Sequence, residues 1–215
     1  TRSTMSIWNS AVLDSPSSID APSDEALMVR VMEGDRDAFS QIYERHAGRI
    51  RGFVSRYVGT GDVADDLTQE IFLKVYRRPA AFDPRSRFLT WLYAVARNAS
   101  IDHLRLRRLP TVPIGTARGE DDAPQVEPAD DHQGPDEVLL NRELKAHLLA
   151  ILDELSPKLK EVFLLCAVEG LSYEEAAQIL NCPMKTVSSR LSRARSQVFV
   201  AYNRFLRSTE DRSRP

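Results

Sequence analysis

The sequence contains little cysteine and no long hydrophobic run, and both scarcities exclude classes of protein. Only two cysteines, Cys166 and Cys182, occur among its 215 residues, and they do not form a CxxC pair. We therefore expect reduced thiols packed among apolar neighbours rather than a disulfide framework or a zinc site, and the four scattered histidines add no ligand spacing. No apolar stretch reaches the ~20 residues of a membrane-spanning helix, so we expect neither membrane insertion nor a secretory signal.

Catalytic signatures are missing as well. There is no Walker loop, no cluster of carboxylates and no metal-ligand spacing, so we expect no enzymatic activity, no metal and no cofactor. A nucleic-acid enzyme remains the alternative from a different functional class, and metal-dependent turnover would support it.

Strand-type alternation of apolar and polar residues is also absent, and apolar residues instead recur at steps of three and four. This periodicity predicts an all-α fold. Asp62 is expected to cap the third helix, after Gly59 and Gly61 end the second. Helices are expected at about 24–33, 35–58, 62 to the loop that begins at 79, 87–107, 136–155 and 157–168, followed by two short helices within 172–195.

These helices group into two small bundles, at 24–109 and 136–207. Residues 110–135 carry five prolines, three glycines and a run of acids, which predicts a flexible acidic linker of 26 residues with a coil span of ~30 Å. Residues 1–23 and 208–215 are expected to be flexible tails.

The net charge of −2 conceals a strong asymmetry along the chain. Residues 183–207 contain six cations and no acid, and residues 85–109 contain six arginines and one aspartate. Residues 118–137 contain one arginine and eight acids. Two basic blocks separated by an acidic spacer are typical of a protein that contacts nucleic acid with two surfaces.

The most informative stretch is 170–195, which predicts two short helices joined by a sharp turn. Ser172 and Glu175 have the spacing of a capping box. Asn181 tolerates a left-handed helix end, and Pro183 suits the start of the next helix. The second helix has Val187 available for packing and a face of hydroxyls and cations, as a helix in a DNA major groove requires. A basic helix exposed to solvent is the alternative for this face.

Three segments in order resemble the bacterial extracytoplasmic-function sigma factors, the RNA polymerase specificity factors that have only regions 2 and 4. The segments are DDLTQEIFLKVYR from Asp65, FLTWLYAVARNASIDHLRLRR from Phe88 and LSYEEAAQILNCPMKTVSSRLSRAR from Leu171. The resemblance covers about 24–206. It implies that the first bundle is region 2, which binds the promoter −10 element, and that the second is region 4, whose helix-turn-helix binds the −35 element.

The resemblance also implies roles for individual residues. In the second bundle, the expected base contacts are Ser188, Ser189, Ser192 and Arg193, and the expected phosphate contacts are Lys185, Thr186, Arg190 and Arg195. In the first bundle, the expected contacts to the −10 strand are Phe82, Asp83, Arg85 and Ser86 in the loop and Trp91, Asn98, Asp102 and Arg105 on the following helix. For Trp91, packing in the core is the alternative to stacking on a base.

The implied partners are core RNA polymerase, promoter DNA and an anti-sigma factor. Asp66, Gln69 and Glu70 correspond to the polymerase-binding face, for which a solvated acidic face is the alternative. The implied location is the cytoplasm, with an inner-membrane anti-sigma protein as one possible form of the partner. A stand-alone helix-turn-helix regulator would explain 171–195, but it leaves the segments at Asp65 and Phe88 without a role.

Overall fold

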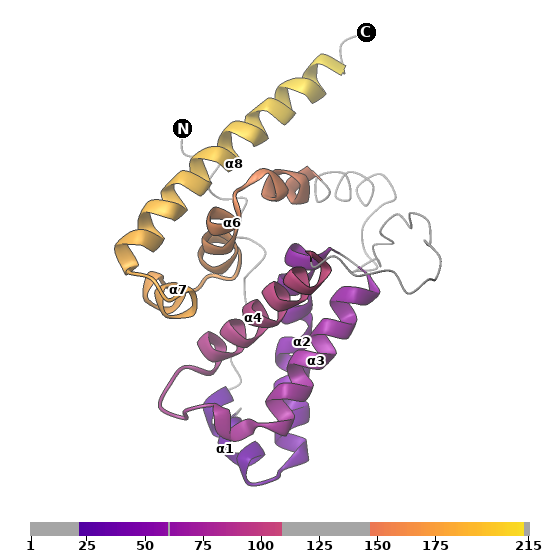
Figure 1. Cartoon of the computed structure of the whole chain (residues 1–215), viewed down its shortest axis with the longest axis vertical. Coiled ribbons are helices and arrows are strands. Elements are labelled where there is room, and N and C mark those ends of the chain that lie inside the picture. Colours follow the sequence, from indigo (N-terminus) through magenta and orange to yellow (C-terminus); the bar gives the residue numbers. More distant parts are fainter. Residues whose placement is uncertain (1–21, 60, 109–146, 213–215) are drawn as a thin grey trace.

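The computed structural model describes residues 22–59, 61–108 and 147–212, and helices joined by short turns make up these ranges (Figure 1). No strand occurs in them, so the prediction of an all-α fold in two small bundles is confirmed. The first bundle consists of α1 (Asp24–Met32), α2 (Arg36–Val58), α3 (Asp62–Arg77), the 3-10 turn η1 (Pro79–Ala81) and α4 (Phe88–Arg108). The second consists of a helical segment at 147–154, α6 (Pro157–Phe163), the π-helical turn η2 (Leu164–Val168), α7 (Tyr173–Leu180) and α8 (Met184–Arg212).

Local capping signals fix where the first helices begin. The Ser23 hydroxyl accepts the backbone N–H of Ala26 at the start of α1, and the Asp35 carboxylate accepts the N–H groups of Asp37 and Ala38 at the start of α2. Side-chain oxygens at these positions satisfy N–H groups that have no partner inside the helix. Asp62 was predicted to cap α3, and this prediction is wrong by one residue. Gly61, at φ 99°, occupies the cap without a side-chain bond, and Asp62 is the first helical residue.

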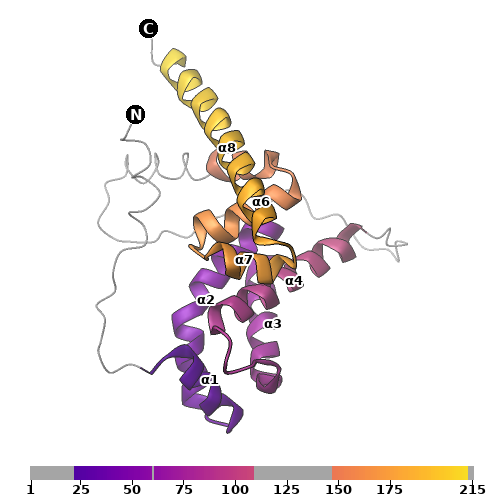
Figure 2. The same ribbon diagram turned by 90° about the vertical axis from the view of Figure 1, so that its left-hand side faces the viewer.

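The core of the first bundle forms around α2, which packs against α1, α3 and α4. The helices α2 and α3 run side by side in both views (Figures 1 and 2). Phe53 of α2 is fully buried and packs its ring against Tyr93 of α4 at a centroid distance of 5.1 Å. His46, also on α2, contacts Phe88 at the start of α4 and the Asp24 carboxylate at 2.8 Å. These contacts fix α4, the helix expected to meet the −10 strand, against α2.

The second bundle packs its helix-turn-helix on α6. Val187, Leu191 and Ala194 of α8 are buried, as their spacing predicts. Both elements of the predicted capping box are present, since the Ser172 hydroxyl accepts the Glu175 N–H and the Glu175 carboxylate accepts the Ser172 N–H. Asn181 ends α7 in the left-handed conformation at φ 48°, and α8 begins directly after Pro183.

Two features of the second bundle differ from the simple helical periodicity. Residues 164–168 widen into a π-helical turn, and α8 continues without interruption to Arg212, through a range that the sequence assigned in part to a tail. The predicted linker at 110–135, the first residues of the predicted helix at 136–155 and the predicted N-terminal tail up to residue 21 lie outside the described residues.

Candidate nucleic-acid interface

The first turns of α8 present a polar, cationic surface. The residues predicted to contact base edges, Ser188, Ser189, Ser192 and Arg193, are all exposed. Lys185 and Arg195, predicted to contact phosphates, are exposed too, and Thr186 is half-buried. The surface is stable in this orientation because the opposite side of the helix is fixed in the core.

Arg190 differs from the other cations of this surface. It is half-buried, and its Nη1 lies 4.0 Å from the Cys182 sulfur in the turn before α8. Its guanidinium therefore lies close to the turn of the motif.

Cys166 lies inside the second bundle, and burial raises the pKa of its thiol to about 11. A protonated, half-buried thiol agrees with a packing role.

The loop before α4 is closed by its own hydrogen bonds. Arg85 Nη2 donates to Asp83 Oδ2 at 2.8 Å, and the Ser86 hydroxyl donates to the Asp83 carbonyl at 2.7 Å. The hydrogen bond from Arg85 lowers the pKa of Asp83 to about 2. Asp83, Arg85 and Ser86 are exposed, so this closed loop presents three predicted −10 contacts to solvent.

Aromatic packing under the loop distinguishes Phe82 from these neighbours. Phe82 is only 2% exposed, with its ring 5.7 Å from Phe88 and 5.4 Å from Trp91. In this structure Phe82 supports the loop from beneath and offers no open face for a base. Trp91 is half-buried, so part of its ring contacts the core and part remains accessible.

Further along α4 lies an exposed polar edge. Asn98, Asp102 and Arg105 are all exposed, at steps of four and three that place them on one side of the helix. Arg105 Nη1 lies 3.7 Å from Asp102 Oδ1, which makes a loose surface ion pair. The structure therefore brings all the predicted −10 residues to the loop and outer side of α4, with Phe82 alone buried.

The predicted polymerase-binding residues Asp66, Gln69 and Glu70 lie exposed on α3. Glu70 pairs with Lys74 one turn later at 2.8 Å. Beside them the structure adds two apolar side chains that sequence reasoning missed, Leu73 and Tyr76, which are 47% and 40% exposed. Their signal is available in the sequence, because both fall off the buried stripe of Leu67, Ile71 and Val75.

The two bundles meet along one side of α4, and Glu169 is the centre of this contact. Its carboxylate, 6% exposed, accepts the Tyr93 hydroxyl at 2.5 Å and Arg56 Nη1 at 3.1 Å. Arg49 donates to the Glu169 carbonyl at 3.1 Å. Burial, reinforced by the Glu169 carboxylate, raises the pKa of Tyr93 well above its ordinary value, so this hydroxyl remains a donor.

Glu161 extends the contact by accepting Arg97 Nη2 at 2.9 Å. In a regular α-helix, Glu161 and Glu169 would point about 80° apart around the axis. The π-helical turn between them, in which the Glu169 N–H donates to the Leu164 carbonyl at 2.9 Å, turns less per residue and brings Glu169 back toward the side of Glu161. The two carboxylates therefore meet Tyr93 and Arg97, which are four residues apart on α4.

Glu175 completes this row at the start of α4. Its Oε1 accepts Arg87 Nη1 at 2.5 Å and the Thr90 hydroxyl at 3.0 Å. Burial alone would raise the pKa of Glu175, but hydrogen bonds from Ser172, Arg87 and Thr90 lower it below its ordinary value. The interaction is therefore fully present above the ordinary glutamate pKa and is lost as pH falls through the lowered one. We call Glu161, Glu169 and Glu175 the acidic row.

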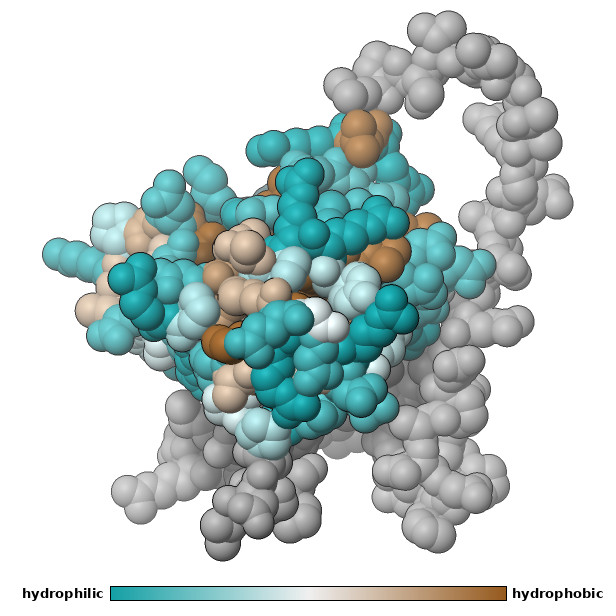
Figure 3. Space-filling view, turned by 90° about the horizontal axis from the view of Figure 1, so that it is seen from below, coloured by the Kyte–Doolittle hydropathy of each residue, from teal (hydrophilic) through white to brown (hydrophobic). Residues whose placement is uncertain are grey.

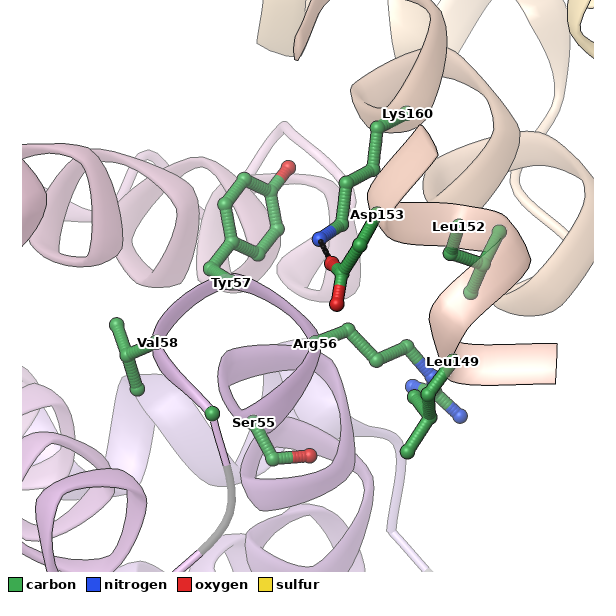
Figure 4. A pocket seen from close by; sticks show the side chains of 9 residues that line it. Ser55, Arg56, Tyr57, Val58, Leu149, Leu152, Asp153 and Lys160 are labelled. Carbon is green, nitrogen blue, oxygen red and sulfur yellow. Dashed lines mark hydrogen bonds and ion pairs between the residues drawn. The ribbon is translucent and has the colours of Figure 1, made fainter. Parts of the chain in front are cut away.

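At the other end of the contact the bundles enclose a hollow of about 300 Å³ (Figure 4). Arg56 and Tyr57 line it from α2, and Asp153 and Lys160 line it from the second bundle, where Lys160 Nζ lies 2.6 Å from Asp153 Oδ1. Because these two charges pair within their own bundle, the polar contact between bundles is carried by the acidic row, which meets α4 and also Arg49 and Arg56 of α2.

The face of the described residues that is seen from below is mostly hydrophilic (Figure 3). Seen from below, hydrophobic residues are scattered among hydrophilic ones (Figure 3). Within 22–59, 61–108 and 147–212, no group of three or more His, Cys, Asp or Glu side chains is arranged to hold a metal ion. No helix in the same ranges is long and apolar enough to cross a membrane.

Comparison with known proteins identifies both bundles. The profile of Sigma-70 region 2 matches residues 42–109, and that of Sigma-70, region 4 matches residues 146–198. The chain is 36% identical over 179 residues to the ECF RNA polymerase sigma-E factor of Haemophilus influenzae, an alignment that covers 81% of this chain and 93% of the relative. It is 35% identical over 177 residues to the ECF RNA polymerase sigma-E factor of Escherichia coli, covering 81% and 92%.

Two solved structures also resemble this chain over most of its length. CnrH in complex with the cytosolic domain of CnrY superposes with a TM-score of 0.62 at 25% identity, covering 84% of this chain and 97% of that one. The sigma factor RpoE in complex with the anti-sigma factor NepR from Bartonella quintana superposes with a TM-score of 0.58 at 25% identity, covering 77% and 96%.

We predict that Glu169→Gln favours separation of the bundles. The substitution keeps the shape of the side chain but removes the charge that Arg56 and Tyr93 share. We call the arrangement with the bundles in contact closed and the arrangement with the bundles apart open. Weakening such buried charge-assisted bonds costs about 2 kcal/mol, which shifts the equilibrium roughly thirtyfold toward the open arrangement. Small-angle X-ray scattering should detect a larger radius of gyration. Glu154→Gln, which removes an exposed acid of the same bundle, is the matched control. An unchanged radius for Glu169→Gln would contradict the central role of this carboxylate.

Proposed function

The chain belongs to the extracytoplasmic-function sigma factors of the sigma-70 family, and we propose that it directs core RNA polymerase to promoters by binding the −35 element with α8 and the −10 element with the first bundle. One observation carries this proposal. Regions 2 and 4 both match in one chain, and the alignment covers 93% of a sigma-E relative. A stand-alone helix-turn-helix regulator has no use for region 2, so that alternative is excluded.

For the −35 element, we infer that α8 enters the major groove with its first turns. The exposed hydroxyls of Ser188, Ser189 and Ser192 are short, so they let the helix approach base edges closely, while Arg193 reaches a guanine. Lys185 and Arg195 lie on either side of this set and suit phosphate contacts, which fix the orientation without reading sequence. Thr186 and Arg190, both half-buried, fit contacts with phosphates at the edge of the groove.

For the −10 element, the proposed mechanism is capture of the displaced non-template strand. The loop supplies Asp83, Arg85 and Ser86, and α4 supplies Trp91 as a stacking surface. Asn98, Asp102 and Arg105 lie further along α4, where the strand would rejoin the duplex. Binding energy gained only with an unpaired strand shifts the equilibrium from closed duplex toward melted DNA. No covalent chemistry is needed, which supports a non-enzymatic role.

Core RNA polymerase is the main partner, and we propose that it docks on α3. Asp66, Gln69 and Glu70 offer carboxylates and an amide to a basic partner surface. Exposed Leu73 and Tyr76 beside them add apolar area of the kind that anchors protein interfaces. The site of action is then the cytoplasm, where polymerase and DNA are found.

An anti-sigma factor is the second protein partner. Both structural relatives reported above are complexes, and one is named as a complex with an anti-sigma factor. The superposition with CnrH covers 84% of this chain and so includes both bundles. This coverage supports an arrangement of the two bundles here that is similar to the one in that complex. We infer that an anti-sigma factor, whether free or held at the inner membrane, binds this closed arrangement and stabilises it.

The function can be tested by run-off transcription with purified core polymerase, the full chain and genomic DNA fragments, with start sites mapped by sequencing. We expect discrete starts that appear only when the protein is added and that share two upstream elements. Discrete footprints on duplex DNA without polymerase, and no added starts, would contradict the proposal.

We predict that Arg193→Ala reduces transcription from these promoters, because it weakens promoter binding by about 1–3 kcal/mol, the value typical of a good base contact. The control is the same promoter with a scrambled −35 element, on which wild type and variant should be equally weak. A loss of the same size on intact and scrambled promoters would instead make Arg193 a non-specific phosphate contact.

We predict that Glu70→Lys weakens binding to core polymerase, since it reverses a charge at the centre of the proposed docking face. Binding is measured by fluorescence anisotropy of the labelled chain against core enzyme. Glu44→Lys makes the same charge change at an exposed position of α2 and serves as the control. Equal affinity of Glu70→Lys and wild type for core would remove Glu70 from the interface.

A further inference from the structure

Two side chains at the start of α4 form a binding arrangement that is independent of the predicted −10 set. Arg87 immediately precedes α4, and Thr90 lies in its first turn. Arg87 Nη1 at 2.5 Å and Thr90 Oγ1 at 3.0 Å both donate to the same oxygen, Oε1 of Glu175. Two donors that converge on one anionic oxygen form the arrangement with which proteins also bind a phosphate oxygen.

The position of this pair agrees with a nucleic-acid ligand. Arg87 follows Arg85 and Ser86 of the loop, and Thr90 directly precedes Trp91. The pair therefore lies within the segment expected to follow the captured strand. Arg87 is 61% exposed even with the bundles in contact, whereas Thr90 is 8% exposed and holds its hydroxyl against Glu175 of the second bundle.

Glu175 has two separate roles, one for each carboxylate oxygen. Oε2 accepts the Ser172 N–H at 2.8 Å and closes the capping box of α7, a contact that stays within the second bundle. Oε1 is the oxygen that reaches across to Arg87 and Thr90. Because the cap does not depend on the first bundle, α7 can move away from α4 with its N-terminus intact.

We propose that Arg87 and Thr90 bind a backbone phosphate of the non-template DNA strand, and that the Glu175 carboxylate takes the place of this phosphate while the bundles are closed. The proposal rests on the promoter-melting function above and adds a direct competition to it. The strand and the second bundle cannot hold the same two donors at once. Capture of the −10 strand therefore requires α7 to leave α4, and closure of the bundles weakens strand binding.

The test measures binding of the purified full chain to a fluorescein-labelled, mixed-sequence single strand of 20 nucleotides, by anisotropy at several salt concentrations. Glu175→Gln keeps a residue that serves in a capping box but removes the negative charge that pairs with Arg87. Since Arg87 is largely exposed, we expect a gain in affinity of about two- to fivefold. Glu174→Gln removes the neighbouring exposed acid and is the control for general charge.

Variants of Arg87 and Thr90 are expected to lower the affinity for the single strand. Arg87→Gln should weaken binding and make the negative slope of log affinity against log salt shallower by about 0.7, the value for one phosphate contact on a single strand. Arg36→Gln, at the exposed first residue of α2, makes the same charge change and should leave the slope unaltered. Thr90→Val removes the hydroxyl donor without changing charge, and it should weaken binding with the slope unaltered.

The decisive variant combines Glu175→Gln with Arg87→Gln. If the two groups compete as proposed, the gain from Glu175→Gln disappears when Arg87 is absent. An undiminished gain in that background, an equal gain from Glu174→Gln, or an unchanged salt slope for Arg87→Gln would each overturn the assignment. Run-off transcription by the wild-type chain separates this failure from failure of the function, because promoter-specific starts do not depend on which residues bind this phosphate.

Discussion

The closed arrangement depends on carboxylates of the second bundle that accept hydrogen bonds from the first. In the described part of the chain, the donors across the contact are Arg49, Arg56, Arg87, Thr90, Tyr93 and Arg97, and the side-chain acceptors are the acidic row. A buried carboxylate is unfavourable unless it is paired with good geometry, so a shift of α4 by one turn would leave charges without partners. Polar pairing of this kind specifies one orientation while contributing modestly to affinity. That combination suits the proposed mechanism, in which the two bundles separate before the −10 strand is captured.

Closure affects the three functional surfaces unequally. The polar surface of α8 and the acidic side of α3 remain exposed, whereas the start of α4 is covered by α7. The free protein can therefore present its proposed −35 and polymerase surfaces while part of its proposed −10 surface is occupied. On the proposed mechanism, docking on polymerase and strand capture are successive events, with bundle separation between them.

Sequence reasoning was most successful where the signal is local. The capping box of Ser172 and Glu175 and the left-handed Asn181 each depend on a few neighbouring residues, and the structure contains both. It failed where the contacts or burial of a residue depend on segments that are distant in the sequence. Glu175 was recognised only as a cap, because nothing nearby in the sequence indicates Arg87, 88 residues earlier. Likewise, the burial of Phe82 depends on Phe88 and Trp91 across a turn, and the position of Glu169 depends on a π-helical turn that periodicity does not predict.

The uninterrupted length of α8 gives it a mechanical property beyond DNA contact. Its 29 residues form one rod of about 43 Å, with the side chains proposed to contact bases at one end and Arg212 at the other. Only the first half lies within the matched region 4, which ends at residue 198. A rod of this length that tilts by about 10° displaces its far end by about 7 Å. On the proposed mode of DNA binding, the helix is therefore a lever, through which a small change of angle in the major groove becomes a large movement at a surface remote from the DNA.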